Sequence, residues 1–380
     1  MENFTAYNPT TLHFGKNVLT SLVPTLELYG KKVLLVYGAG SVKKSGLYDR
    51  ILTLMNYAGL EVFEYGGIRP NPVIEDVDAA AETGRKNKVD VILAVGGGSV
   101  IDSSKIISVT IPSGHGGWDF FNGKATAVKA IPLVAVPTLA ATGSEMNPFA
   151  VVSNHAVGLK SAFGSPLTFP KHSFLDPGLT LTVPRNYTAY GIADLIAHCF
   201  EAWFGIGETT LTDQFVISIV KEAMEYGPKL IDDLQNYELR EKIMFAATMA
   251  LNGTTMYGRS TGDWGVHSAG HTLSLLYDVP HGASLTIVYP AWMKHFRDRI
   301  SGRIAQIGSA LFNADLTTDQ SIAKIENFFT SIGCPTRFSD LSITGDPTKS
   351  IFDAMVNSKV NGGNIKMKEE DYKALISLYL

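Results

Sequence analysis

The first half of the chain alternates short apolar runs with amphipathic segments, and this alternation restricts the fold more than any other feature. Four apolar runs end at glycine or proline, and they cover residues 32–38, 61–67, 89–99 and 131–137. Continuous apolar runs of this kind are typical of strands that are buried on both faces, as in a parallel sheet. Because helical periodicity separates the runs, we expect strand–helix–strand crossovers and a doubly wound α/β sheet.

After Pro184 the strand pattern fades and helical periodicity takes over. A chain of 380 residues is also long for a single core. Two prolines and a glycine interrupt the pattern near residues 176–186, where we place a domain boundary. The prediction is an α/β domain at residues 1–180 and an all-α domain at residues 181–380.

The composition excludes several classes of protein. Hydrophobic residues make up 45% of the chain and charged residues 18%, which argues against disorder. The net charge of −4 provides no basic surface for nucleic acid or anionic lipid. The two cysteines, Cys199 and Cys334, rule out a disulfide framework and suit a reducing compartment. Without an apparent signal peptide or membrane-length apolar run, we expect a soluble cytoplasmic protein with no nucleic-acid or membrane partner.

A glycine-rich loop follows the third apolar run, in "VILAVGGGSVIDSSKII" at residues 91–107. Gly97, Gly98 and Ser99 come between a predicted strand and a predicted helix, where backbone N–H groups and the helix end can bind a phosphate. A tight strand–helix turn with no ligand is the alternative. Asp102, one turn into the helix, can bond to the loop itself or hold a ribose or nicotinamide group.

The first apolar run ends in "YGAGSVKKSG", which resembles a dinucleotide fingerprint but has Lys43 in place of the last glycine. An NAD site usually has a carboxylate near this point, to bind the ribose 2′-hydroxyl. Here the chain has Gly38, Gly40 and Ser41, with Lys43 and Lys44 beyond. Small residues, a hydroxyl and positive charge favour the 2′-phosphate of NADP, unless both lysines are only solvated surface charges.

A third polar loop, residues 137–148, follows the fourth apolar run and contains Thr138, Thr142, Ser144 and Asn147. These side chains can cap the next helix without binding anything. However, three polar or glycine-rich loops then leave the carboxyl edge of one parallel sheet, which is where such sheets bind ligands. We therefore expect residues 1–180 to be a dinucleotide-binding domain.

The helical segment "GIADLIAHCFEAWF", residues 191–204, is mostly apolar but contains Asp194 and His198. Residues four apart share one face of a helix. One interpretation is a local hydrogen-bonded pair within the core. The other is half of a metal site, because an unpaired charge in an apolar segment is costly.

The other half of such a site is available in residues 263–290, where His267, His271 and His281 occur close together. One aspartate and three histidines can form a mixed oxygen and nitrogen site for Zn²⁺ or Fe²⁺ with a position open to substrate. A dinucleotide and a Lewis acid are together what hydride transfer to or from a carbonyl requires. We therefore expect a metal-dependent oxidoreductase.

Nearly the whole chain resembles the iron-containing (group III) alcohol dehydrogenase family, in its NADPH-dependent butanol dehydrogenase and aldehyde reductase branch. The motifs that carry the resemblance are "TLHFGKN", "YGAGSVKKSG", "RPNP", "GGGSVID", "PTLAATGSE", "DPGLTLTVP", the helix with Asp194 and His198, and "GDWGVHSAGHTLSLLYDVPHG". The resemblance implies a Rossmann-like parallel sheet, an all-α metal-binding domain, NADP(H) as cofactor and a homodimer that pairs through an N-terminal edge strand. It also implies reduction of butanal-like aldehydes with broad specificity.

The resemblance also assigns roles to residues. It implies one divalent ion, Fe²⁺ or Zn²⁺, bound by Asp194, His198, His267 and His281. His271 is similar to the family's non-ligand histidine near the nicotinamide and is the candidate catalytic residue. The positions that match cofactor contacts are Gly38, Gly40, Ser41, Asn71, Gly97, Gly98, Ser99, Asp102, Thr138, Thr142, Asn147, Lys160 and Leu179.

Three alternatives remain at this point. A lyase of the dehydroquinate synthase type has a similar plan, but its phosphorylated and carboxylated substrate needs several Lys and Arg residues, which the candidate site segments lack. A glycerol-type polyol dehydrogenase is closer in chemistry but more naturally NAD-linked. A non-catalytic metal- or nucleotide-binding protein predicts no turnover. Leu139 and Ala141 depart from the family's usual loop residues without touching the metal ligands.

Overall fold

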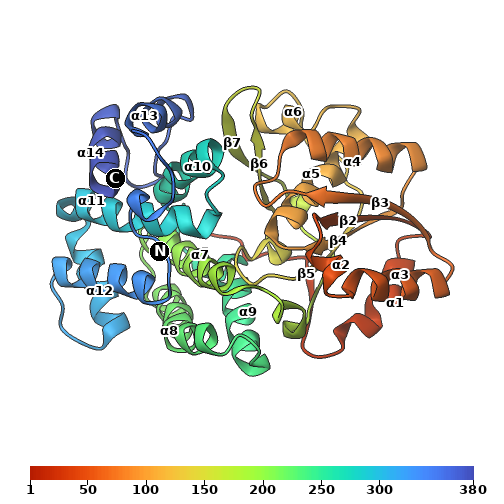
Figure 1. Ribbon diagram of the computed structural model, residues 1–380, viewed down its shortest axis with the longest axis horizontal. Coiled ribbons are helices and arrows are strands. Elements are labelled where there is room, and N and C mark those ends of the chain that lie inside the picture. The colour runs from red at the N-terminus through yellow and green to blue at the C-terminus, as the bar shows by residue number, and fades with distance from the viewer. The chain divides into compact units, whose positions relative to one another are not determined.

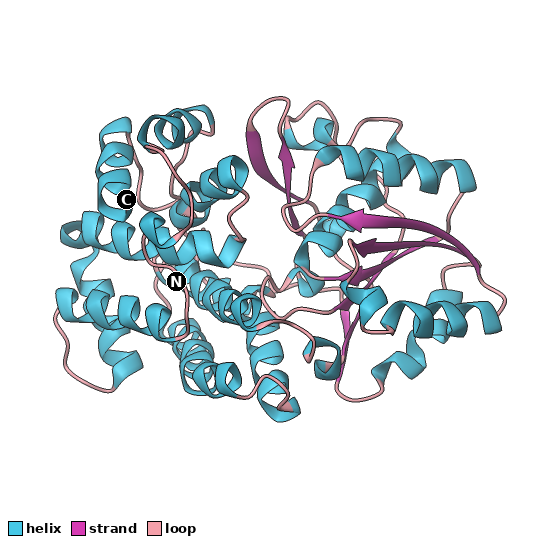
Figure 2. Cartoon of the chain, in the orientation of Figure 1, coloured by secondary structure: helices cyan, strands magenta, loops and turns pink.

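The computed structural model describes residues 1–380 and divides into two compact units. One unit is Asn8–Val183, and the other combines Met1–Tyr7 with Pro184–Leu380. All strands belong to the first unit, as Figure 2 shows by colour. The N-terminal residues join the helical unit through a hydrogen bond from Glu2 N to Gly258 O (2.8 Å). None of the helices has the length and apolar character needed to cross a membrane.

The α/β unit contains a six-stranded parallel sheet in the order β1-β8-β5-β4-β2-β3. The strands of this sheet are β1 (Thr11–Phe14), β2 (Lys32–Gly38), β3 (Glu61–Ile68), β4 (Val91–Gly96), β5 (Leu133–Pro137) and β8 (His172–Leu175). β6 (Phe149–Asn154) and β7 (Leu159–Gly164) form a separate antiparallel pair. The predicted parallel α/β fold is confirmed.

The sheet strands that the apolar runs predicted are β2, β3, β4 and β5. The apolar pattern showed neither β1 nor β8, because each has four residues, too few to form a distinctive run. The family resemblance had implied an N-terminal edge strand, and β1 lies at the edge of the sheet. The hairpin of β6 and β7 also went unpredicted, since exposed or half-buried residues interrupt both of its strands.

Helices cover both faces of the sheet. Side chains alternate between the two faces along each strand, and because the central strands β2, β4 and β5 are apolar on both faces, each face packs against helices. Leu34 and Ile92 belong to a core that includes side chains of α4 and α5, while Leu35 and Leu93 belong to a core that includes α1 and α3. Figure 1 shows these two helical layers. The helices of this unit are α1 (Leu22–Glu27), α2 (Ser41–Lys44), α3 (Leu47–Tyr57), α4 (Ile74–Asn87), α5 (Gly98–Ser113) and α6 (Trp118–Phe121).

The strand order reverses between β2 and β4, since the chain goes from β2 outward to β3 and then returns to the other side of β2. In open parallel sheets the loops at such a reversal form the ligand site, because neighbouring loops diverge there at the carboxyl edge. The loops that leave β2 and β4 are "GAGS" and "GGS". The topology therefore places both phosphate-loop candidates at the same point.

The second unit is helical. Its helices are α7 (Arg185–Trp203), α8 (Thr210–Asp232), α9 (Tyr237–Leu251), α10 (Gly265–Tyr277), α11 (His281–Phe312), α12 (Thr318–Ser331), α13 (Thr348–Asn357) and α14 (Glu369–Tyr379). α7 packs against α8, α9 and α11. Residues 191–203 of α7 are all buried, so this part of the helix is enclosed on every side. Short 3-10 helices complete the chain, and they are η1 (Val18–Ser21), η2 (Ser144–Met146), η3 (Pro166–Thr168), η4 (Pro177–Thr180), η5 (Thr254–Met256) and η6 (Phe338–Asp340).

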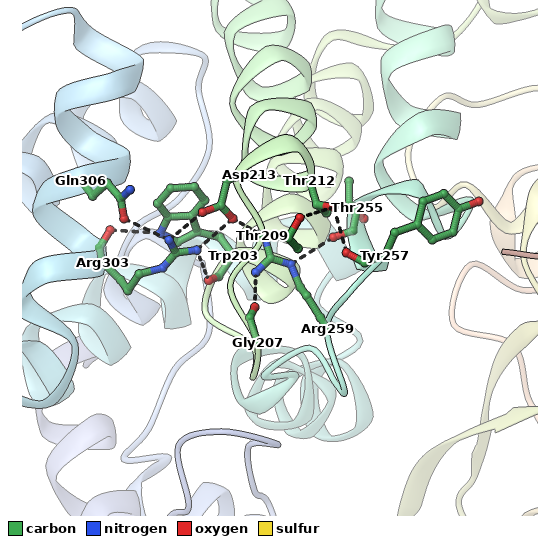
Figure 3. A network of polar contacts seen from close by, with 10 residues as sticks. All are labelled: Trp203, Gly207, Thr209, Thr212, Asp213, Thr255, Tyr257, Arg259, Arg303 and Gln306. Atoms are coloured by element: carbon green, nitrogen blue, oxygen red, sulfur yellow. Dashed lines mark hydrogen bonds and ion pairs between the residues drawn. The ribbon is translucent and has the colours of Figure 1, made fainter. Parts of the chain in front are cut away.

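A polar network holds the end of α7 (Figure 3). Asp213 on α8 accepts hydrogen bonds from Arg259 and, at 2.8 and 3.1 Å, from Arg303 on α11. The Arg303 guanidinium also lies 3.6 Å from the ring centroid of Trp203 and donates to the Trp203 carbonyl (2.9 Å). The network ties α7, α8 and α11 together and fixes the last turn of α7.

Candidate metal centre and cofactor loops

α7 supplies the first two residues of the metal-site candidate. Asp194 and His198 are one turn apart, and His198 Nε2 lies 3.6 Å from Asp194 Oδ1. The same carboxylate oxygen lies 3.9 Å from Nε2 of His267 on α10 and 3.6 Å from Nε2 of His281, the first residue of α11. One oxygen is thus within 4 Å of three imidazole nitrogens from three helices.

The chemistry of this donor set fits a divalent metal. Oδ1 of Asp194 and the nitrogens of His267 and His281 belong to a group whose ligand atoms all lie within 4.8 Å of one another. His198 is outside that group, although it is near Asp194 and its ring stacks on that of His267 (centroids 4.9 Å apart). Imidazole nitrogens with one carboxylate oxygen are ligands that Zn²⁺ and Fe²⁺ both accept.

Burial differs among the four side chains. Asp194, His198 and His267 are between 3% and 8% exposed, whereas His281 is 26% exposed. The open side of the cluster is therefore at His281. Burial, followed by the proximity of His267, lowers the pKa of His198 well below its usual value, so this imidazole is neutral. Neutral imidazole is the form that binds metals.

Glu201 is part of this site, and the sequence analysis missed it. Its Oε1 accepts hydrogen bonds from the backbone N–H of His267 (3.1 Å) and from His267 Nδ1 (2.7 Å). Its Oε2 accepts the backbone N–H of Trp264 (2.6 Å). Burial raises the pKa of Glu201 to about 8, while the hydrogen bonds from His267 and Trp264 act in the opposite direction. Because the backbone contacts donate N–H, the geometry accommodates the ionised carboxylate.

A sequence signal for Glu201 did exist. Asp194, His198 and Glu201 are at positions i, i+4 and i+7 of one helix, which places all three on one face. Three polar residues on one face of an otherwise apolar helix are a stronger pattern than Asp194 and His198 alone.

His271 lies on α10, one turn after His267, and is half-buried. Its ring centroid is 5.4 Å from that of His281 and the rings are tilted by 37°. His271 is not among the mutually close ligand atoms. The structure therefore places it next to the metal-site candidate and outside the donor set.

Gly97 and Gly98, two of the cofactor candidates, lie at the loop after β4. A Cβ at Gly98 would lie 2.5 Å from the Thr142 side chain, so internal packing alone requires glycine there. A Cβ at Gly97 would meet only Leu139, at 3.6 Å, and the φ of −75° is ordinary. Nothing inside the unit demands glycine at position 97, whereas close approach of a phosphate to the backbone would. Gly97 precedes α5, whose first N–H groups have no side-chain cap.

A buried lysine organises the loop after β5, and this residue also escaped the sequence analysis. The ammonium of Lys105 donates to Ser144 Oγ (2.7 Å), Asn147 Oδ1 (3.1 Å) and the Phe149 carbonyl (2.6 Å). Burial lowers the pKa of Lys105 to about 8, and the negative charge of Asp102 opposes that shift. Ser144 in turn donates to Asp102 Oδ1 (2.5 Å). The predicted contact residues Asp102 and Asn147 are thus joined through Lys105 and Ser144.

The remaining cofactor candidates occupy several elements. Lys160 on β7 donates to Asn71 Oδ1 (2.9 Å), which brings two of them into direct contact. Ser99, in the first turn of α5, donates to the Pro70 carbonyl. Thr138 follows β5, and its backbone N–H donates to Gly96 O (3.0 Å). Leu179, on η4, packs against the core of the sheet face that includes α1 and α3.

Gly38 ends β2, Gly40 is the N-cap of α2, and Ser41 is the first residue of that helix. A Cβ at Gly40 would meet nothing within 4 Å, so no other residue fills the space beside this position. Lys43 Nζ lies 4.9 Å from the ring centroid of Tyr37 and 4.6 Å from that of Tyr48. Lys43 therefore rests against two aromatic rings rather than extending freely into solvent.

A parallel α/β unit with phosphate-type loops at its strand reversal, together with a helical unit that carries an Asp and His donor set, is the architecture expected of a metal-dependent nicotinamide dehydrogenase. Residues 9–177 match the family described as iron-containing alcohol dehydrogenase. Residues 188–379 match the C-terminal part of the Fe-containing alcohol dehydrogenase family.

Individual proteins agree with these matches. A probable NADH-dependent butanol dehydrogenase of Bacillus subtilis is 42% identical over 99% of both chains. An NADPH-dependent aldehyde reductase of Escherichia coli is 36% identical over 91% of this chain and 90% of its own. The crystal structure of an NADH-dependent butanol dehydrogenase from Thermotoga maritima superposes with a TM-score of 0.96 at 34% identity, covering 100% of this chain and 99% of that one.

The chain belongs to the iron-containing alcohol dehydrogenase family. The resemblance inferred from the motifs is thereby confirmed, and the chain is an oxidoreductase of the alcohol dehydrogenase type with a nicotinamide cofactor and a divalent metal. The lyase and polyol dehydrogenase alternatives are not favoured by these relatives.

Proposed function

We propose that the chain is an NADPH-linked reductase of aldehydes, acting on butanal-like substrates with broad specificity. The observation that carries this proposal is the position of Asp194 Oδ1, between 3.6 and 3.9 Å from three imidazole nitrogens. The butanol dehydrogenase and the aldehyde reductase among the relatives support the substrate class. An aromatic ring beside the donor set supports an apolar substrate, since the Trp264 centroid is 5.4 Å from that of His267.

In this proposal Asp194, His198, His267 and His281 hold one Fe²⁺ or Zn²⁺ ion. When bound, the ion supplies Lewis acidity toward a carbonyl oxygen and the reduced nicotinamide supplies hydride. The burial of the α7 face keeps Asp194 and His198 out of water, which strengthens their interaction with a cation. His271, next to His281 and outside the donor set, is the group we assign to proton transfer at the alcohol oxygen.

The most direct test is a steady-state panel of aldehydes and polyols with NADPH and NADH, on protein whose metal has been quantified by elemental analysis. We expect the highest kcat/KM for aliphatic aldehydes with NADPH. Higher kcat/KM for glycerol-type polyols with NAD would instead support a polyol dehydrogenase. If metal-replete protein turned over none of these substrates, the result would support a non-catalytic binding protein and overturn the proposal.

The preference for NADPH is the finer part of the proposal, because relatives are named for NADH as well as for NADPH. It rests on the loop after β2, where Gly38, Gly40 and Ser41 provide no carboxylate to compete with a 2′-phosphate. Open space at Gly40 supports it. In the rest of the cofactor site we assign contacts to Asn71, Gly97, Gly98, Ser99, Asp102, Thr138, Thr142, Asn147, Lys160 and Leu179.

Gly38→Asp tests this preference. A Cβ at position 38 would make ordinary contacts, 3.6 Å from Ile68 O and 3.7 Å from Val100 Cγ2, so the variant should fold. Because a carboxylate there repels a 2′-phosphate, we expect the ratio of kcat/KM for NADPH to that for NADH to fall at least about tenfold, or about 1.4 kcal/mol. Gly38→Asn, with the same shape and no charge, is the control. An equal change of the ratio in both variants would refute a charge-based preference.

His271→Ala tests the proton-transfer assignment. We expect kcat to fall by about 10²-fold, the lower range for loss of a general acid or base, while the metal content measured by elemental analysis stays stoichiometric. His115→Ala, at an exposed histidine of the α/β unit, is the control and should leave kcat unchanged. Loss of metal from His271→Ala would make this residue a ligand instead.

We also propose a cytoplasmic homodimer that pairs through β1. β1 is at the edge of the sheet, next to β8. Edge strands can pair with a strand of another chain, so a second copy of β1 would extend the sheet across the two subunits. This part of the proposal depends on the family resemblance and on the position of the strand.

A further inference from the structure

Glu201 makes contacts that go beyond those of a helix cap. The carboxylate accepts hydrogen bonds from two backbone N–H groups at the start of α10, those of Trp264 and His267. It also forms a hydrogen bond with the ring nitrogen Nδ1 of His267 (2.7 Å). Its side chain is only 1% exposed, so water does not compete for these contacts. The carboxylate is therefore in fixed contact with the imidazole of a proposed metal ligand.

The direction of the ring contact determines the proton position on His267. Oε1 of Glu201 accepts the His267 backbone N–H and Oε2 accepts that of Trp264, so both oxygens act as acceptors, as in an ionised carboxylate, and Nδ1 is the donor to Oε1. A proton on Nδ1 of a neutral imidazole leaves the lone pair on Nε2. Nε2 is the nitrogen that lies 3.9 Å from Asp194 Oδ1 within the donor set. The contact thus selects the tautomer that can bind a metal without first losing a proton.

We propose that Glu201 is a positioning residue for the metal centre, which fixes both the rotation and the tautomer of His267. The inference rests on the proposed metal site and assigns to it a residue beyond the four ligands. Acceptors of this kind generally raise the basicity of a ligating imidazole, and their loss lowers metal affinity by about 10- to 100-fold.

A neighbouring carboxylate separates this role from simple support of the helix start. Asp263 is fully buried and accepts backbone N–H groups from Gly265 (3.0 Å), Asn364 (3.2 Å) and Ile365 (2.7 Å). It anchors the start of α10 to residues 364–365 and accepts no hydrogen bond from an imidazole ring. Asp263 and Glu201 are therefore matched in burial and in the number of N–H donors. They differ in that Glu201 contacts a ligand ring and also bonds to the side chain of Tyr289.

The substitutions Glu201→Gln and Asp263→Asn use this difference. In either orientation of the new amide, an NH₂ group faces an N–H donor, so each variant loses part of its hydrogen bonding and stability. Glu201→Gln has a further effect on His267. If the amide NH₂ faces Nδ1, it favours the tautomer with the proton on Nε2. If the amide oxygen faces Nδ1, it is a neutral and therefore weaker acceptor than the carboxylate. Both variants lose backbone hydrogen bonds of a buried carboxylate, whereas the effect on the ligand is specific to position 201.

The experiment measures Zn²⁺ affinity of the full-length protein by competition with a chromogenic chelator, together with the thermal unfolding midpoint of the metal-free form. We expect the Zn²⁺ affinity of Glu201→Gln to fall about 10- to 100-fold, and that of Asp263→Asn to stay within about threefold of wild type. The thermal unfolding midpoints of the two variants should fall by similar amounts. Equal losses of affinity in the two variants, or wild-type affinity in Glu201→Gln, would overturn the inference. Failure of the wild type to bind Zn²⁺ would instead overturn the proposed function.

A second measurement needs no variant at position 201. The long-range ¹H–¹⁵N correlations of histidine-labelled, metal-free wild-type protein report the tautomer of each ring, and His267→Gln identifies the His267 signals. The inference requires a proton on Nδ1 and none on Nε2. A proton on Nε2, or on both nitrogens at neutral pH, would overturn it even if both variants failed to fold.

Discussion

Asp194→Asn is expected to abolish aldehyde reduction and stoichiometric metal binding together. The substitution keeps the shape of the side chain but removes the negative charge next to three imidazole nitrogens. We expect metal affinity and kcat/KM each to fall by more than about 100-fold, beyond the effect of losing an outer hydrogen-bond partner. Elemental analysis and steady-state kinetics on the same preparation measure both quantities.

Metal removal from the wild type should reproduce this result. Chelation should abolish activity, and Zn²⁺, Fe²⁺, Mn²⁺ or Co²⁺ should restore it in the wild type and fail to restore it in Asp194→Asn. Cys199→Ala is the matched control, because Cys199 follows His198 on the buried helix α7 and is a free thiol outside the donor set. Full activity of metal-free wild type, or equal metal loss in Cys199→Ala, would contradict the assignment of Asp194.

Asp213→Asn is expected to destabilise the helical unit more than any surface substitution. It removes the one carboxylate that accepts from both Arg259 and Arg303 in the network of Figure 3. The Arg259 side chain is fully buried, so the variant leaves a buried guanidinium without its ion-pair partner. Breaking a buried pair in this way costs about 3–5 kcal/mol, which corresponds to a fall of about 6–20 °C in the unfolding midpoint.

The control is Asp319→Asn, which breaks the exposed ion pair with Arg297 (3.0 Å). Exposed pairs contribute about 0–1 kcal/mol, so the midpoint should change little. Calorimetry of the three proteins at one pH makes the comparison. Equal midpoints for Asp213→Asn and Asp319→Asn would show that the buried network adds no stability.

The pH dependence of this difference has a definite sign. Burial opposes ionisation of Asp213, but the hydrogen bonds and charges of Arg303 and Arg259 outweigh it and lower the pKa. A group whose pKa is lower in the folded state stabilises the fold above its unfolded pKa, about 4 for aspartate, and loses that contribution as the pH falls further. The stability gap between wild type and Asp213→Asn should therefore narrow below about pH 4. A gap that widens on acidification would contradict the ion-pair explanation.

Much of the fold could be predicted because it depends on local pattern. β2, β4 and β5 are buried along their whole length or nearly so, and strands of this kind are continuous apolar runs in the sequence. β1 and β8 could not be found in the same way, since four residues carry too little pattern and their pairing partner is far away in the chain.

Some residues of the candidate site could be predicted from local sequence pattern, and others could not. Asp194 and His198 are visible from their spacing on one helix, and the sequence-based argument for His267 and His281 depends on their clustering. Glu201 and Lys105 escaped because their importance depends on partners 66 and 42 residues away, at His267 and Asn147. Lys105 has no local signature, since the cost of its burial and the compensation for it are both properties of the folded state. Glu201 has only the weaker signal of sharing a helix face with Asp194 and His198, which does not show its contact with His267.

By itself the sequence determined the parallel α/β fold, the helical second half, the family and the residue types available for chemistry, because periodicity, glycine placement and motif spacing act over short distances. Only the tertiary structure decided which nitrogen of His267 faces Asp194, which carboxylate holds that ring, and how Lys105 joins Asp102 to Asn147. Those features depend on distances of a few ångströms between atoms from different elements, and packing of the whole core sets such distances.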